Sequence, residues 1–350
     1  MMAFMRWRRV WRRARSMHAT PFIAVLIVLL TVGVLAAPLT AEAQPAASVP
    51  RIGYLAPGYP SDPRVGERFL QAFRQGLREL GYVEGQNIVI EFRSAEGKYD
   101  RLSALAAELI RFKVNVIVAP ASPATQAAKQ ATETIPIVMV NVADPVATGF
   151  VASLARPGGN ITGLSLMLPE LVGKQLELLK EVVPKVSRVA LLGNPANPTI
   201  ALLVQHAQDA ARILKVRLQL LEARDSSEID SAFAAITAER AGAVIVLTDS
   251  VTLDHRTRIA DHAVRRRLPT VFGVSEFAEA GGLLAYGPRL ADRYRRAATY
   301  VDTILKGAKP ADLPVAQPTT FDLVVNLRAA KALGLTIPQA VLQRADRIIE

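Results

Sequence analysis

The chain has 350 residues, which is enough for two domains of ordinary size; 51% are hydrophobic and 6% aromatic. It contains no cysteine, and this excludes disulfides, thiolate metal sites, a cysteine nucleophile and a lipid-modified N-terminal cysteine. The formal net charge is +11, but six arginines crowd the first 15 residues and the other arginine groups lie in helical patterns typical of solvated faces, so we expect no nucleic-acid partner.

The first 43 residues have the layout of a secretory signal peptide. The basic stretch is followed by an apolar run at 22–37 and by Ala-Glu-Ala at 41–43. Because the apolar run is shorter than the usual membrane span of about 20 residues, we expect cleavage after Ala43; an uncleaved membrane anchor is the alternative. Export by the general or by the twin-arginine route stays open.

After a flexible lead-in at 44–50, short apolar runs alternate with amphipathic helices. The helical pattern after the first strand repeats apolar residues at Phe69, Phe73, Leu77 and Leu80 and ends at Gly81. Two more helices are predicted at 100–110, capped by Asp100, and at 122–133. The predicted strands of this first block lie at 51–56, 87–93, 114–119 and 135–140.

The same alternation repeats in the second half. Helices are predicted at 171–183, 198–215, 226–240 and 253–267, and strands at 188–192, 216–222, 243–248 and 269–274. Ser226 or Ser227 is the expected cap of the third helix. Two blocks of alternating strands and helices predict an α/β protein with two Rossmann-like lobes, each an open parallel sheet covered by helices on both faces. Ligands of such folds bind at the carboxyl ends of the strands.

Long segments of the chain are similar to a known family. The chain resembles the ABC transporter substrate-binding proteins whose relatives include tryptophan-binding proteins, on stretches that include GYVEGQN (81–87), PGGNITG (157–163) and GGLLAYG (281–287). The resemblance implies a type I periplasmic-binding-protein fold with a three-crossing hinge near Gly163, Gly282 and Pro318. Lobe one would then comprise residues 50–163 plus 283–317, and lobe two residues 164–282 plus 318–350.

The resemblance also implies a function. The chain would be the periplasmic solute-binding component of an ABC importer, capturing a small polar solute such as an amino acid between its lobes. The permease and the ATPase would be encoded elsewhere, because this sequence has no Gly-x-x-x-x-Gly-Lys phosphate loop. Membrane contact would come only through the permease or an uncleaved leader. The alternative is a periplasmic ligand sensor that presents its closed form to a membrane receptor.

Four polar side chains after predicted strands are candidates for binding the charged ends of a ligand. Ser122 and Thr125 lie at a helix start, where amides and hydroxyls favour a carboxylate; a plain cap is the alternative. Asp144 and Asp249 could each pair with a ligand ammonium, and a turn or a helix cap is the alternative for each.

Three further residues complete the predicted ligand site. Asn194 could donate to a carboxylate or accept from an amine, although its Asn-Pro neighbourhood also suits a turn. Tyr54 and Tyr286 end strands and could wall the pocket; a half-buried tyrosine at a sheet edge is the alternative. Because both tryptophans, Trp7 and Trp11, lie in the leader, an aromatic ligand would have to be held by Tyr or Phe.

Catalytic and cofactor motifs are missing from the sequence. There is no Gly-x-Ser-x-Gly nucleophile elbow and no Gly-x-Gly-x-x-Gly after a strand, which argues against a secreted hydrolase or dehydrogenase. His255 and His262 are seven residues apart, wider than the four-residue spacing of a helical zinc pair. We therefore expect no catalytic residue, no metal site and no cofactor.

Overall fold

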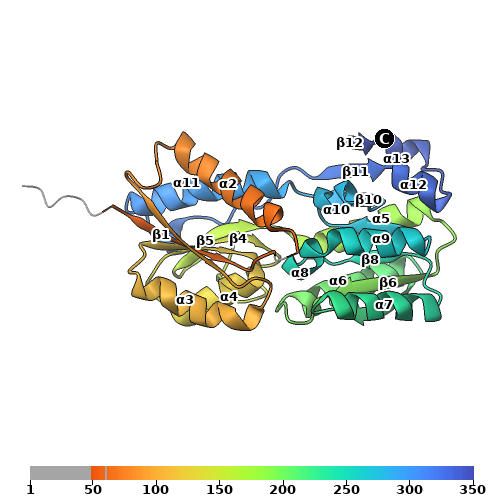
Figure 1. Cartoon of the computed structure of the whole chain (residues 1–350), viewed down its shortest axis with the longest axis horizontal. Helices are drawn as coiled ribbons and strands as arrows, with labels where there is room; N and C mark the ends of the chain where they lie inside the picture. The colour runs from red at the N-terminus through yellow and green to blue at the C-terminus, as the bar shows by residue number, and fades with distance from the viewer. Residues whose placement is uncertain (1–48, 60) are drawn as a thin grey trace, which may run out of the picture. The chain divides into compact units, whose positions relative to one another are not determined.

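A computed structural model describes residues 49–59 and 61–350 of the chain (Figure 1). The predicted signal peptide and its cleavage site lie outside the described residues. Within residues 49–59 and 61–350, no helix combines the length and the apolar character needed to cross a membrane.

The first sheet has five parallel strands in the order β2-β1-β3-β4-β5. They are β1 (Arg51–Ala56), β2 (Val89–Ser94), β3 (Val116–Pro120), β4 (Ile137–Val142) and β5 (Ile161–Ser165). β3, β4 and β5 are buried along their whole length, which agrees with their mainly apolar sequences. This sheet is the centre of lobe one.

Helices cover both faces of the first sheet (Figure 1). On one face α2 (Pro63–Glu79) packs against α11 (Leu290–Leu305), and on the other α3 (Leu102–Arg111) packs against α4 (Ala121–Ala131). The start of α2 is fixed by Asp62, whose carboxylate accepts from the Arg64 amide, and by Pro63 in the first turn. Its apolar stripe buries Phe69, Phe73 and Leu77, as the spacing predicts, whereas Leu80 stays 38% exposed.

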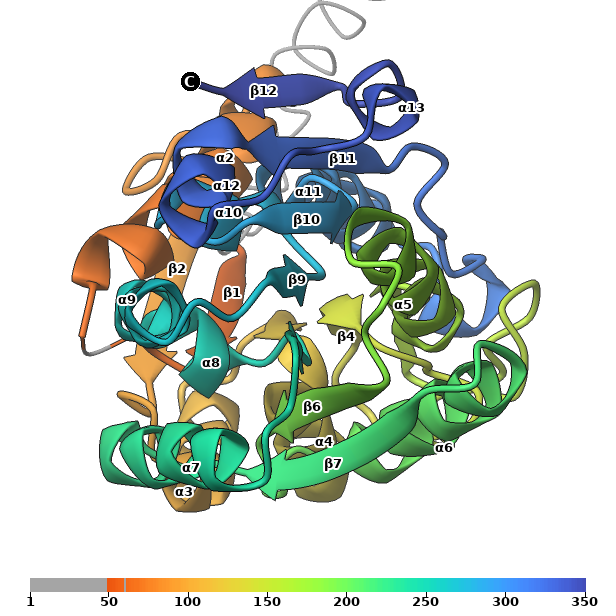
Figure 2. The same ribbon diagram turned by 90° about the vertical axis from the view of Figure 1, so that its right-hand side faces the viewer.

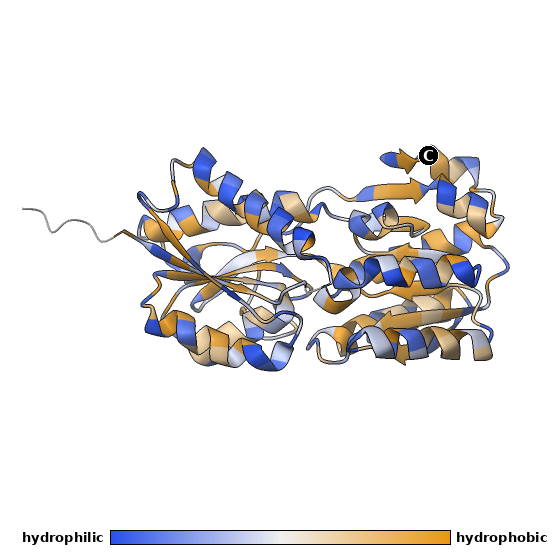
Figure 3. Ribbon diagram, in the orientation of Figure 1, coloured by the Kyte–Doolittle hydropathy of each residue, from blue (hydrophilic) through white to orange (hydrophobic). Residues whose placement is uncertain are grey.

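The second sheet has seven strands in the order β12-β11-β10-β9-β8-β6-β7 and is the centre of lobe two (Figure 2). All neighbouring strands are parallel except β10 and β11. Its strands are β6 (Arg188–Gly193), β7 (Arg217–Glu222), β8 (Val244–Val246), β9 (Thr270–Phe272), β10 (Leu284–Gly287), β11 (Asp322–Asn326) and β12 (Arg347–Ile349). The strands of both sheets are mainly hydrophobic, and the helices alternate between hydrophobic and hydrophilic residues along their length (Figure 3).

Helices flank the second sheet on both sides (Figure 2). One face carries α5 (Leu168–Val182), α6 (Ile200–Ile213) and α13 (Gln339–Leu342); the other carries α7 (Ser226–Ala238), α9 (Arg256–Arg265), α10 (Ser275–Glu279) and α12 (Leu327–Leu333). The short α8 (Ser250–Asp254) precedes α9 and replaces the first turn of the single helix predicted at 253–267. Asp225, and not Ser226 or Ser227, caps α7, because its carboxylate accepts from two amides of the first turn.

One predicted lobe boundary is wrong. The sequence placed residues 283–287 in lobe one, but β10 pairs with β9 and β11 and so belongs to the sheet of lobe two. The chain returns to lobe one only between β10 and α11. Gly287 approaches the Gly273 backbone so closely that a Cβ atom would overlap the Gly273 carbonyl oxygen, which ties β10 to lobe two.

Candidate ligand-binding site

A cavity of about 40 Å³ lies where the carboxyl ends of the two sheets face each other. Lobe one contributes the loop after β1, the start of α4 and the end of β4, and lobe two contributes the loops after β6 and β8. The carboxyl edge is where open α/β sheets bind ligands. The polar residues around this inter-lobe cavity are Tyr59, Ser122, Asn141, Asn197, Thr199, Thr248, Asp249, Ser250 and Tyr294.

The N-terminus of α4 opens onto the inter-lobe cavity. Ala121 has a left-handed backbone with φ of 61°, so the chain turns sharply from β3 into the helix. Pro120 stands at the cap position, and no side chain caps this helix. Ala121 and Ser122 line the cavity, and Ser122 is buried. Amides at an uncapped helix N-terminus favour an anion such as a carboxylate.

Asn141 brings a buried hydrogen-bond donor without a partner to the same cavity. Arg293 Nε donates to Asn141 Oδ1 at 2.8 Å, and since arginine has only donors this contact fixes the orientation of the amide. Asn141 Nδ2 is buried and has no hydrogen-bond partner among the described residues. The residue also has a left-handed backbone with φ of 60°. An unsatisfied buried donor costs about 1–3 kcal/mol, so its retention suggests a ligand.

Arg293 and Tyr294 support Asn141 from α11. Burial lowers the pKa of Arg293 to about 10, and its Nη2 also donates to the carbonyl of Ser165, where β5 ends. Burial raises the pKa of Tyr294, and donation from the Asn141 side chain lowers it, so Asn141 Nδ2 lies close to the Tyr294 hydroxyl although the two do not meet the geometry of a hydrogen bond. On the lobe-two side Thr248 carries a buried hydroxyl, Oγ1, that likewise has no partner among the described residues.

Asp249 is a buried carboxylate whose oxygens are fully used in this conformation. Oδ1 accepts from Asn194 Nδ2 at 3.0 Å and from the Val251 amide at 2.8 Å. Oδ2 accepts from Asn197 Nδ2 at 2.9 Å and from the Tyr99 hydroxyl at 3.0 Å. Three of these donors belong to lobe two, and Tyr99 comes from lobe one. The Tyr99 contact therefore joins lobe one to lobe two at Asp249.

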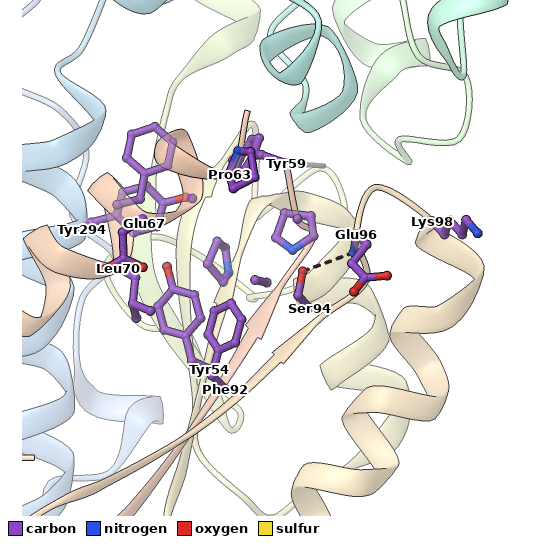
Figure 4. A pocket seen from close by; sticks show the side chains of 16 residues that line it. Tyr54, Tyr59, Pro63, Glu67, Leu70, Phe92, Ser94, Glu96, Lys98 and Tyr294 are labelled. Carbon is purple, nitrogen blue, oxygen red and sulfur yellow. Dashed lines mark hydrogen bonds between the residues drawn. The ribbon is translucent and has the colours of Figure 1, made fainter. Parts of the chain in front are cut away.

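A larger cavity of about 660 Å³ lies within lobe one, between α2 and β2 (Figure 4). We call it the aromatic pocket, since its walls include Tyr54, Tyr59, Phe69, Phe92 and Tyr294. Tyr54 stacks on Phe92 with ring centroids 5.8 Å apart, and Phe69 stacks on Tyr294 at 4.6 Å. Burial raises the pKa of Tyr54 and Tyr59, so both hydroxyls stay neutral at physiological pH.

Polar contacts hold the two lobes together beside α8. The Asp254 carboxylate, in lobe two, accepts from the amides of Ser61 at 2.9 Å and Asp62 at 3.1 Å in lobe one. Arg256 Nη2 lies 2.6 Å from Asp62 Oδ2, and Arg68 Nη2 lies 3.1 Å from Glu276 Oε1. Burial raises the pKa of Glu276, and Arg68 offsets part of this shift. The structure is thus a closed arrangement of the lobes.

The structure brings several of the predicted site residues together. Ser122 and Asp249 line the inter-lobe cavity, and Asn194 is hydrogen-bonded to Asp249. Tyr54 lines the aromatic pocket, although at 3% exposure it is more buried than a sheet-edge tyrosine. As ligand contacts these four remain predictions.

The other three predicted residues make contacts within their own lobe. Thr125 Oγ1 donates to the carbonyls of Ala119 and Ala121, both at 3.0 Å. Asp144 accepts from the amides two and three residues ahead, which is the turn arrangement that the sequence left open. Tyr286 stacks on Phe321 in lobe two at 6.0 Å. None of the three lines the inter-lobe cavity or the aromatic pocket.

Sequence reasoning missed the residues whose role depends on distant partners. Asn141, Tyr99 and Tyr294 act through contacts with side chains more than a hundred residues away or from the other lobe. The signal that could have found Asn141 is its place at the end of a buried strand, three residues before the predicted Asp144. Tyr59 follows β1 in the Pro-Gly-Tyr-Pro loop, and this position predicts a ligand loop.

No metal cluster emerges from the part of the chain that the structure describes, since it holds no group of three or more His, Asp or Glu able to share an ion. Instead, the two histidines considered above have protein partners. His255 Nδ1 lies 3.1 Å from Ser61 Oγ, and His262 Nε2 lies 2.6 Å from Asp230 Oδ1.

Two α/β lobes with parallel-dominated sheets, linked by three crossings and enclosing a polar cavity, define the type I periplasmic-binding-protein fold. Residues 67–349 match the family described as ABC transporter substrate binding protein, and the chain belongs to this family.

Two relatives illustrate the family. The "Tyrosine-binding protein" of Clostridioides difficile (strain R20291) is 27% identical over 265 residues, which is 76% of each chain. A crystal structure of a Streptococcus pneumonia ABC domain in complex with L-Trp is 27% identical, with a TM-score of 0.78, and covers 86% of this chain and 100% of its own.

A third relative bears on the conformation. The ligand-free, open structure of a Clostridium difficile substrate-binding protein with adhesive properties is 25% identical and covers 85% of this chain and 98% of its own, but its TM-score is 0.60. The L-Trp complex, of similar identity and coverage, scores 0.78. The lobes of this chain are therefore arranged more as in the ligand complex, in agreement with the contacts across the lobes.

Proposed function

We propose that this chain captures an α-amino acid between its lobes, outside the cytoplasm, and delivers it to the permease of an ABC importer. The chemistry around the inter-lobe cavity supports an amino acid. Lobe one offers donors for a carboxylate, from the α4 N-terminus, Ser122 and Asn141. Lobe two offers the Asp249 carboxylate, on which a ligand ammonium would take the position that the Tyr99 hydroxyl occupies in this structure. A zwitterion carries both a carboxylate for the donors of lobe one and an ammonium for the carboxylate of lobe two.

The unpartnered Asn141 Nδ2 is the observation that carries this proposal. This donor lies beside the uncapped amides of α4, and its lack of a partner is explained if a ligand carboxylate accepts a hydrogen bond from it. The two relatives named for tyrosine binding and solved with L-Trp support an amino acid as the ligand class. The proposed importer role, the periplasmic location and removal of residues 1–43 rest on the family and on the leader's sequence.

Thermal stability in the presence of amino acids and their analogues tests the proposal. A bound ligand at a thousand times its dissociation constant adds about 4 kcal/mol of stability, and the melting temperature rises by several degrees. We expect the rise with one or more L-amino acids, and its loss with the matching amine or the matching N-acetyl derivative. Absence of a shift with all the standard amino acids, for a folded chain, would overturn the proposal.

The variant Asn141→Ala addresses the residue itself. Removing the amide takes away one donor to the carboxylate, so we expect about tenfold weaker binding of the amino acid. The control is Asn160→Ala, since Asn160 belongs to lobe one, lies outside the cavity and donates only to the carbonyls of Thr132 and Ile135. Equal losses in both variants would mean that Asn141 has no particular part in binding.

A further inference from the structure

Arg293, on α11, is a buried cation without an anionic partner among the described residues. Its side chain is only 5% exposed. Burial and the cation Arg296 lower the pKa of Arg293 to about 10, and of the groups that act on it only Tyr300 raises this pKa; no carboxylate does. Burying a charge is costly unless a counter-charge lies close by. The cost of keeping Arg293 in this position therefore calls for a role there.

Two hydrogen bonds fix the guanidinium of Arg293. Its Nε donates to Asn141 Oδ1 at 2.8 Å, and its Nη2 donates to the carbonyl of Ser165. The two acceptors lie at the ends of β4 and β5, which are neighbours in the sheet of lobe one. Both acceptors are neutral, so they satisfy N–H groups without neutralising the charge. A planar guanidinium that is held at two points always presents its donor to Asn141 in the same direction.

The orientation of the Asn141 amide decides what the inter-lobe cavity offers to a ligand. A half turn of an amide exchanges its donor for its acceptor. Because arginine only donates, Oδ1 has to face Arg293, and the amide Nδ2 is the group that remains without a partner beside the cavity that Asn141 lines. In the reverse orientation Nδ2 would meet the Arg293 donor, and Oδ1 would repel a ligand carboxylate.

We propose that Arg293 is the positioning residue of the carboxylate subsite: it holds Asn141 so that Nδ2 donates to the ligand carboxylate, and this carboxylate provides the counter-charge of Arg293. The inference rests on the proposed function, since it takes the amino acid to lie with its carboxylate at Asn141. Arg293 does not line the inter-lobe cavity and acts through Asn141. Its effect on binding therefore depends on the presence of the Asn141 amide.

A double-mutant cycle tests whether Arg293 and Asn141 act together. The full chain is screened with the standard L-amino acids, and the one that raises its melting temperature most is titrated by calorimetry into Arg293→Met, Asn141→Ala and the double variant. Methionine is flexible, carries no charge and suits a buried position. We expect about tenfold weaker binding in each single variant, and much less than a further tenfold loss when the two are combined.

The size of the combined loss separates the possible outcomes. Losses that multiply to about a hundredfold in the double variant would mean that Arg293 acts independently of Asn141, and would overturn the inference while amino-acid capture stands. The control is Arg296→Met, which removes a positive charge from an exposed position on the same helix. We expect its affinity to be unchanged, and a loss equal to that of Arg293→Met would contradict the inference. If no standard amino acid binds the unaltered chain, the proposed function fails, and the inference with it.

Asn141→Asp supplies Arg293 with a counter-charge from the protein itself. Aspartate has the shape of asparagine and also tolerates the left-handed backbone at this position. Its carboxylate would pair with Arg293, so we expect the melting temperature of the ligand-free protein to rise by a few degrees. It would also place a negative charge where the ligand carboxylate binds, so amino-acid binding should weaken by more than about a hundredfold.

This variant keeps Arg293, so the test does not depend on the folding of Arg293→Met. Combining Asn141→Asp with Arg293→Met should lower the melting temperature below that of both single variants, because the carboxylate is then buried without a cation. An Asn141→Asp variant that melts below Asn141→Ala, or that binds the amino acid as tightly as the unaltered chain, would show that Arg293 neither compensates the charge at this position nor orients a donor for the ligand.

Discussion

At the scale of single residues, Thr248 offers a test in which stability and binding change in opposite directions. Its buried hydroxyl has no partner among the described residues, so Thr248→Val replaces an unsatisfied polar atom with a methyl group of the same shape. We expect the free energy of unfolding of the ligand-free protein to rise by about 1 kcal/mol, and ligand affinity to fall severalfold. Urea unfolding and calorimetric titration measure the two effects.

Thr252→Val is the control, because this hydroxyl is fully bonded. Thr252 Oγ1 donates to the Leu247 carbonyl at 3.0 Å and accepts from the Asp249 amide at 3.1 Å, so its loss should destabilise the fold by about 1–3 kcal/mol. A loss of stability in Thr248→Val comparable to that in Thr252→Val would show that the Thr248 hydroxyl is satisfied, and that it is not held in reserve for a ligand.

The sequence predicts residues that depend on local position better than residues that depend on distant contacts. That Ser122 and Asp249 line the inter-lobe cavity could be predicted because each lies within three residues of the end of a buried strand, where the fold class places ligands. Asn141 has the same kind of position, but its meaning depends on Arg293, which is 152 residues away in the chain. The residues next to Asn141 in the sequence cannot show which polar atom of its amide already has a hydrogen-bond partner.

At the scale of elements, the contact between α2 and α11 depends on Gly76. A Cβ atom there would overlap the Arg295 carbonyl oxygen and lie 2.9 Å from the Ala298 Cβ, both on α11. Gly76→Ala must therefore push the two helices apart, and we expect it to cost about 1–3 kcal/mol of stability despite the better helix propensity of alanine. Thermal unfolding measures the cost.

Gly66→Ala is the matched control in the same helix. Its added Cβ meets only the edge of the Tyr59 ring, which can move by a few tenths of an ångström, so the gain in helix propensity should dominate. A Gly76→Ala variant as stable as Gly66→Ala would mean that the helices adjust freely, and that their close approach does not contribute to the stability of lobe one.

Element type was more predictable than element assignment to a lobe. The strands predicted at 51–56 and 188–192 correspond to β1 and β6, because apolar patterning is a local property. The lobe to which β10 belongs cannot be deduced from the local sequence, because it depends on the pairing of β10 with β9 and β11. The Gly-Gly pair before β10 suggested a linker instead. Gly282 in fact accommodates the ring of Phe272, against which a Cβ atom would clash.

At the scale of the whole described unit, the closed state is stabilised by contacts that form between the lobes only when the lobes meet. The fold class follows from sequence, since two α/β blocks imply two sheets with facing edges, whereas the hinge is implied only by the resemblance to the family. The contacts themselves do not follow, because Asp254 and its partners Ser61 and Asp62 belong to different lobes. Such contacts favour the closed state, and a ligand gains affinity from whatever stabilises that state.

Asp254→Ala tests this coupling between closure and affinity. The Asp254 carboxylate is buried and accepts from two backbone amides of the opposite lobe, so its loss should weaken the closed state far more than either lobe. We expect about tenfold weaker amino-acid binding and a larger radius of gyration of the free protein by small-angle X-ray scattering. Asp261→Ala is the control, since Asp261 is exposed on the adjacent α9. If Asp254→Ala and Asp261→Ala bind the amino acid equally well, the contacts beside α8 do not contribute to closure, and affinity must then come from the cavity residues alone.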